Sequence, residues 1–179
     1  MHEVACVALA SGASYGAPSM ANTIEEVIAT IGSSKFVAQA CMVLANHADA
    51  SRASQDAIAA AGGVDGVTAA MGVHQQDPAV QLWACVALQS IAHQNYHTKA
   101  KIAASSGVEA VMAAMDTFTD DPGVQLAACG LLLSLSAEKS ICAQIKAAGA
   151  ADKVQRARAA ADAAKQTHIV THALQLRIA

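Results

Sequence analysis

Aromatic residues, proline and charge are all scarce in this chain of 179 residues. Aromatics make up 3% of it, and there are only three prolines. A core must therefore be built from Ala, Val, Leu, Ile and Met, and Ala has the best intrinsic helix propensity. This composition predicts an all-α chain. Charged residues account for 14%, against roughly 25% in an ordinary soluble domain, which indicates that part of the surface is covered in an assembly or by a larger parent protein.

The little charge present is unevenly distributed. The formal net charge of -3 argues against a basic nucleic-acid binder. Residues 138–179 nevertheless carry 3 acids and 7 bases. Lys153, Arg156, Arg158 and Lys165 have two interpretations: contact with an acidic partner or the acidic half of a neighbouring copy, or a solvated outer helix face. We expect the solvated face.

Long apolar runs and targeting signals are also lacking. No run reaches the roughly 18 residues that a membrane-spanning helix needs, so we expect no membrane insertion. The chain has Glu3 near its start and no arginine before Arg52, which matches neither a signal peptide nor an Arg-rich transit peptide. We therefore expect an intracellular protein of a reducing compartment, with the cytoplasm as first choice and organelle import left open.

The chain does contain an internal repeat. Residues 77–92 read DPAVQLWACVALQSIA, and residues 121–136 read DPGVQLAACGLLLSLS. A weaker copy lies at 40–46 and a fragment at 5–10. Self-similarity at a period of 20–50 residues is typical of stacked repeats. The spacing here is 44 residues, so the sequence predicts an architecture of this kind.

Each clear repeat is predicted to contain three helices. Asp77-Pro78 and Asp121-Pro122 are helix starts, because aspartate caps free backbone amides and proline has no amide to leave unpaired. Thr23 is a further candidate N-cap. We expect a short helix at 3–10 and a loop at 11–22. The remaining helices are expected at 24–31, 35–48, 54–61, 64–72, 78–92, 98–105, 108–117, 122–137, 139–148, 151–164 and 166–178.

Each unit has three expected helices, a Gly before the second helix and Val-Gln-x-x-Ala at the start of the third. This pattern resembles the armadillo repeat family, in the divergent form found in algae and protists. The residues that carry the resemblance are Ile58, Gly63, Val64, Val67, Val80, Gln81, Ala84, Leu88 and Ile91, and their equivalents Ile102, Gly107, Val108, Val111, Val124, Gln125, Ala128, Leu132 and Leu135. The resemblance implies a right-handed α-solenoid forming one domain over 1–179. Its clear repeats span 54–92 and 97–137, and degenerate ones span 1–50 and 139–179.

The resemblance also implies a concave groove lined by the third helices. Armadillo proteins that bind peptides carry a Trp on each of these helices, followed four residues later by Asn. At the matching positions of this chain every Trp is absent, and Asn46 is the one Asn present. We expect a shallow, weakly polar surface that suits an apolar helix better than a basic peptide. Trp83 could line this surface, but we expect it to be buried. The candidate groove residues are Met42, Asn46, Trp83, Val86, Ser90, His93, Gly130 and Ser134.

Chemistry-bearing motifs are few. Four of the five cysteines (Cys6, Cys41, Cys85 and Cys129) share one place in the repeat, which predicts reduced, buried thiols that pack as small apolar groups; Cys142 lies outside this register. The pairs His93/His97 and His168/His172 have the i,i+4 spacing of metal ligands, but no third ligand lies nearby in sequence. No catalytic motif appears. We expect no enzyme activity, no metal and no cofactor.

The sequence thus favours a non-catalytic protein–protein interaction module, with two alternatives. One is a structural or scaffold subunit of a larger complex, possible settings being cytoskeletal, ciliary or organellar. The other is an adaptor whose groove recognises a transient peptide or helix of a partner protein. The low charge and the degraded peptide ladder favour the structural subunit. Neither alternative involves nucleic acid.

Overall fold

The computed structural model describes residues 23–33, 36–163 and 177–178, and over these residues the chain is all-α, without strands. The class predicted from composition is confirmed. The elements expected at 3–10 and 11–22, and most of the helix expected at 166–178, lie outside the described residues. The helices are α2 (Ile24–Ser33), α3 (Val37–Ala50), α4 (Arg52–Ala60), α5 (Gly63–Val73), α6 (Pro78–Ile91), α7 (Tyr96–Ala104), α8 (Gly107–Thr117), α9 (Pro122–Leu135), α10 (Lys139–Ala147) and α11 (Ala150–Ala163).

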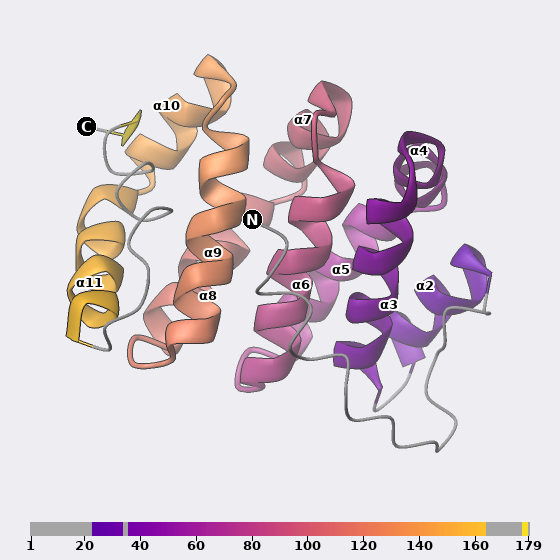
Figure 1. Ribbon diagram of the computed structural model, residues 1–179, viewed down its shortest axis with the longest axis horizontal. Coiled ribbons are helices and arrows are strands. Elements are labelled where there is room, and N and C mark those ends of the chain that lie inside the picture. The colour runs from indigo at the N-terminus through magenta and orange to yellow at the C-terminus, as the bar shows by residue number, and fades with distance from the viewer. Residues whose placement is uncertain (1–22, 34–35, 164–176, 179) are drawn as a thin grey trace.

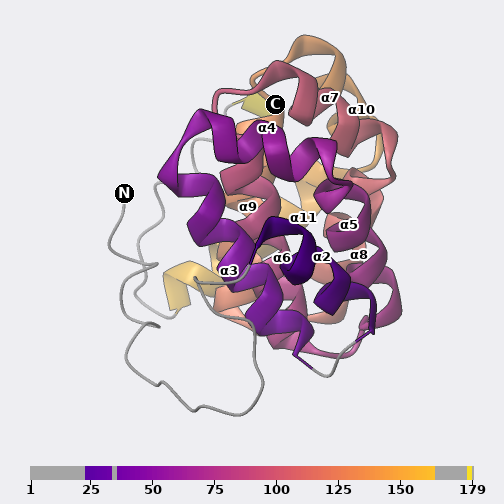
Figure 2. The ribbon, with the colours of Figure 1, turned by 90° about the vertical axis from the view of Figure 1, so that its right-hand side faces the viewer.

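The helices form similar three-helix units arranged in a row in chain order (Figure 1). α4, α5 and α6 make one unit, and α7, α8 and α9 make the next. The third helices α3, α6 and α9 lie side by side, α3 against α6 and α6 against α9. The second helices α5 and α8 lie behind them, and α4, α7 and α10 form one edge of the molecule (Figure 2). One continuous face is therefore built from third helices.

Capping side chains fix where these helices begin. The Asp77 carboxylate accepts from the backbone N–H groups of Ala79 and Val80, at 2.9 and 3.3 Å, and Asp121 accepts from that of Val124 at 3.0 Å. A proline follows each aspartate, as predicted. Thr23 and Glu26 exchange hydrogen bonds in a capping box that starts α2.

Two first helices begin earlier than their apolar pattern predicts. α4 starts at Arg52 and not at 54, because Ser51 caps it by accepting from the backbone N–H of Ser54 at 3.1 Å. α7 starts at Tyr96 and not at 98, because the buried Asn95 accepts from the N–H of Thr98 at 3.2 Å. Polar caps set these boundaries, so periodicity alone placed them two residues too late.

A tight corner joins the first and second helices of each unit. Gly62 takes a φ of 83° there, and Ser106 takes 58° at the same place in the next unit. The following glycine has no room for a side chain. A Cβ on Gly63 would lie 2.5 Å from Ile58 Cγ2, and one on Gly107 would lie 2.6 Å from Ile102 Cγ2. The glycines of the repeat therefore allow the first helix to cross closely over the second.

A repeated glutamine ties the second helix of each clear unit to the third. Gln81 Nε2 donates to the carbonyls of Met71 and His74, at 2.9 and 3.0 Å. Gln125 Nε2 makes the equivalent bonds to Met115 and Phe118, at 2.7 and 2.8 Å. Both glutamines are buried. They satisfy carbonyls at the end of the second helix that have no partner within that helix, and so they fix its angle to the third.

Candidate interaction surface

The third helices bring the predicted groove residues to corresponding positions in neighbouring units. Met42, Val86 and Gly130 are spaced by 44 residues on α3, α6 and α9, and all three are half-buried. These are the positions at which the predicted resemblance to armadillo proteins would place tryptophan. A Cβ on Gly130 would approach Gln89 Oε1, on the adjacent α6, to 2.8 Å. A large side chain at 130 would therefore displace Gln89, whose role sequence reasoning missed.

The second row of predicted groove residues is less uniform. Asn46 and Ser134 are half-buried, whereas Ser90 is only 9% exposed. Ser90 therefore offers a partner less surface than the other two residues. Its helix α6 packs against both α3 and α9. Central units of a row lose more surface to their neighbours than outer ones, and the linear sequence does not reveal this.

Trp83 and His93 lie at opposite ends of the predicted surface. Trp83 is half-buried and packs against the core. Its side chain is therefore neither fully buried, as we expected, nor fully exposed to a partner. His93 is exposed in the turn after α6, which ends at Ile91, while His97 lies in α7. The two rings therefore do not share one helical face. Among the residues that the structure describes, no group of three or more His, Cys, Asp or Glu side chains could hold a metal ion.

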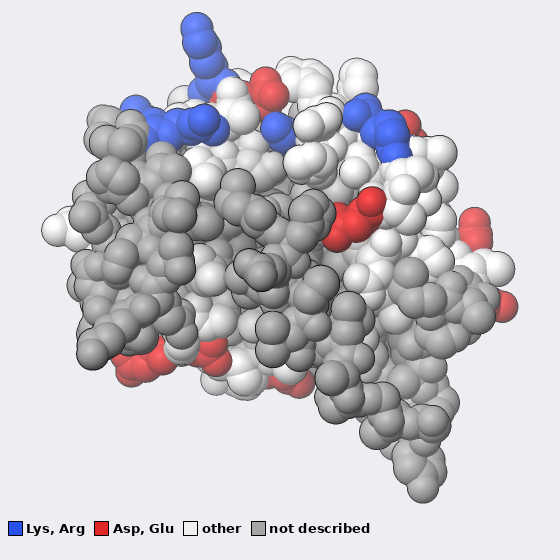
Figure 3. All heavy atoms as spheres, viewed as in Figure 1, with Lys and Arg blue, Asp and Glu red and all other residues white. Residues whose placement is uncertain are grey.

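Two of the third helices, α6 and α9, are also unusual in what they lack. α6 and α9, each 14 residues long, contain no Asp, Glu, Lys or Arg. Basic groups gather over α4, α7 and α10 with some acidic groups among them, and further acidic groups lie along the opposite edge (Figure 3). Asp77 and Asp121 are the N-cap residues of α6 and α9, so these two acids lie at the starts of the helices and not along them. Two uncharged helices thus lie between two charged edges.

Cysteines of the repeat form a buried row along the third helices. Cys41, Cys85 and Cys129 are free thiols, each with 0% exposure. The prediction of buried, reduced thiols is confirmed for these three; Cys6 lies outside the described residues. Burial raises the pKa of each of these thiols to about 12, and at Cys85 the neighbouring Cys129 and Cys41 contribute to this rise after burial. These side chains are therefore packing groups without nucleophilic character at neutral pH.

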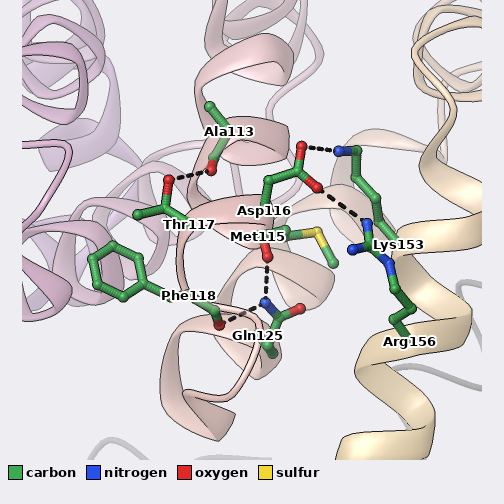
Figure 4. Close-up of polar contacts among 8 residues, drawn as sticks. All are labelled: Ala113, Met115, Asp116, Thr117, Phe118, Gln125, Lys153 and Arg156. Atoms are coloured by element: carbon green, nitrogen blue, oxygen red, sulfur yellow. Dashed lines mark hydrogen bonds and ion pairs between the residues drawn. The ribbon is translucent and has the colours of Figure 1, made fainter.

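Asp116, at the end of α8, gathers two basic side chains from α11 (Figure 4). Lys153 Nζ pairs with one carboxylate oxygen, and Arg156 Nη2 lies 3.0 Å from the other. The hydrogen bond from Lys153 is the largest cause of a lowered pKa at Asp116. Asp116 belongs to the preceding unit. The Lys153 side chain is only 16% exposed in this pair, whereas the Arg156 side chain is 57% exposed and keeps the expected solvated position. The Arg158 side chain and Lys165 lie outside the described residues.

Comparison of the chain with protein-family models, with curated proteins and with solved structures gives no match. Over the part of the chain that the structure describes, no helix has both the length and the apolar character to cross a membrane.

Proposed function

We propose that this chain is a right-handed α-solenoid of armadillo-type three-helix repeats and that it serves, without catalytic activity, as a structural or scaffold subunit of a larger protein complex. One observation carries the proposal: α6 and α9 lie side by side and carry no charged residue over their full lengths. The cores of protein interfaces are depleted of charge in this way. A helix that always faced water would normally carry charge on its solvent side.

The alternative function, an adaptor for a transient peptide or helix, has some support from the same surface. Asn46 and Ser134 are half-buried polar side chains on third helices, and such groups could orient a bound backbone. However, Ser90 is buried between them in the row, and a side chain at position 130 would meet Gln89. A continuous ladder of polar contacts is thus interrupted at its centre, which favours a broad, permanent interface over peptide capture.

Site-specific photo-crosslinking in cells of the source organism tests this proposal. A photoreactive amino acid at Val86, half-buried on α6, is expected to give one or a few defined crosslinked protein products. The matched control is Ala113, an exposed residue of α8 on the helix layer behind α9, where we expect at most weak crosslinks. Defined products from Ala113 and none from Val86 would refute the assignment of the third-helix surface.

A further inference from the structure

A shallow cavity of about 520 Å³ lies beside α10, well away from the uncharged centre of the third helices. Its lining includes three basic side chains, Lys139, Lys146 and Arg177. Figure 3 shows basic groups collected at this end of the edge. Arg177 is tied to the end of α9, because its Nη1 donates to the Leu133 carbonyl at 3.2 Å. A guanidinium has five N–H donors, so most of them remain available.

Basic residues elsewhere on the same edge already have partners. Arg52 pairs with Asp56 at 3.3 Å and donates to the Gln94 carbonyl at 2.9 Å. Lys101 lies 3.1 Å from Asp65 and also donates to the Ala59 carbonyl. These contacts hold neighbouring units together.

No such pairing neutralises the α10 cavity. Within the described residues, Lys139, Lys146 and Arg177 take part in no ion pair. The nearest acid in sequence is Glu138, whose carboxylate lies 3.9 Å from Lys99 Nζ. The cavity therefore presents three positive charges whose counter-charge must come from outside the described chain or from solvent.

The spacing of the charges indicates the shape of the ligand. Lys139 and Lys146 are seven residues apart on α10, about 10 Å along the helix axis. A single phosphate needs donors that converge at hydrogen-bond distance. Acidic side chains three residues apart on a peptide in the extended polyproline II conformation lie on one face, about 9 Å apart, because this helix repeats about every three residues. Ala143 and the half-buried Cys142 lie between the lysines and form a low floor that leaves room for a backbone.

We propose that the α10 cavity binds an extended acidic segment of a partner protein, with carboxylates about three residues apart. This proposal concerns a different surface from the third helices and does not depend on them. Binding would be driven by charge, and it should weaken as salt screens the exposed groups.

The test uses fluorescence anisotropy with a labelled peptide of sequence Gly-Glu-Gly-Gly-Glu-Gly-Gly-Glu-Gly, and with the same peptide carrying Gln for Glu. The double variant Lys139→Gln/Lys146→Gln should weaken binding of the Glu peptide by about tenfold or more, through the loss of two charge-assisted contacts. The matched control, Arg52→Gln/Lys101→Gln, removes the same net charge from basic residues that already have partners. It should weaken binding less than about threefold.

The proposal would be overturned if the native protein bound the Glu peptide no more tightly than the Gln peptide. It would also be overturned if the two double variants weakened binding of the Glu peptide equally, because that would indicate non-specific attraction. Displacement of the peptide by pyrophosphate at a lower concentration than by unlabelled peptide would also overturn it, in favour of a phosphate site. Circular dichroism checks that each variant is folded. The single variant Lys146→Gln, with the exposed Lys139 retained, provides the same comparison if the double variant does not fold.

Discussion

The free energy of unfolding is expected to fall by about 4 kcal/mol between about pH 8 and pH 10 from three buried thiols alone. The pKa values of Cys41, Cys85 and Cys129 are raised from 9.0 to about 12. Above pH 9 the unfolded chain releases these protons while the folded chain retains them, so rising pH favours unfolding. Each thiol contributes about 1.4 kcal/mol over this two-unit pH interval. The stabilisation is present below pH 9 and is lost progressively towards pH 12.

Urea unfolding of Cys85→Ala at both pH values isolates one of these contributions. The variant should lose about 1.4 kcal/mol less stability than the native protein over the interval. Leu88→Ala, three residues along the same buried helix, is the matched control: it should lower stability by about 2–5 kcal/mol at both pH values, without changing the pH dependence. Native thiol labelling that reaches completion within seconds at neutral pH would show that the thiols are not protected.

Replacing Gln125 with leucine is expected to destabilise the fold by about 2–4 kcal/mol, because it removes two hydrogen bonds and leaves a buried carbonyl without a donor. Gln125 Nε2 donates to Met115 O and Phe118 O. Phe118 O keeps a second donor, the backbone N–H of Asp121 at 3.2 Å. Most of the cost should therefore arise at Met115, where the end of α8 loses its link to α9.

Chemical denaturation measures this effect, with Gln144→Leu as its control. Gln144 is exposed on α10, so the same change of side chain should alter stability by less than about 0.5 kcal/mol. Equal stability of Gln125→Leu and the native protein would show that the repeated glutamine does not hold the second and third helices together.

Features determined by neighbouring residues were predictable from the sequence. Asp77 and Asp121 mark helix starts because their caps act on amides two or three residues away. Gly63 and Gly107 are the first residues of the second helices, and the close approach of Ile58 and Ile102 explains why no larger residue fits there. The 44-residue period then placed the third helices in equivalent positions, which was sufficient to predict the all-α class and the buried cysteines.

Features that depend on the packing of one unit against the next were not predictable. The partner of Lys153 and Arg156 is Asp116, about 40 residues away, and no periodic pattern links them, because the positions equivalent to Asp116 in the neighbouring units are Gly72 and Ala159. Burial of Ser90 likewise depends on the distance between adjacent third helices. The repeated glutamine was visible as a motif, but its acceptors follow only from the angle between two helices.

The central claim, that the uncharged third-helix surface is permanently covered by other proteins, is tested most directly by the native mass of the protein isolated from its source. We predict a defined mass well above that of one chain, with the same companion proteins retained through purification, because a surface depleted of charged side chains is typical of the core of a protein interface. A single chain that runs as a clean, soluble monomer with no stable companion would contradict the account.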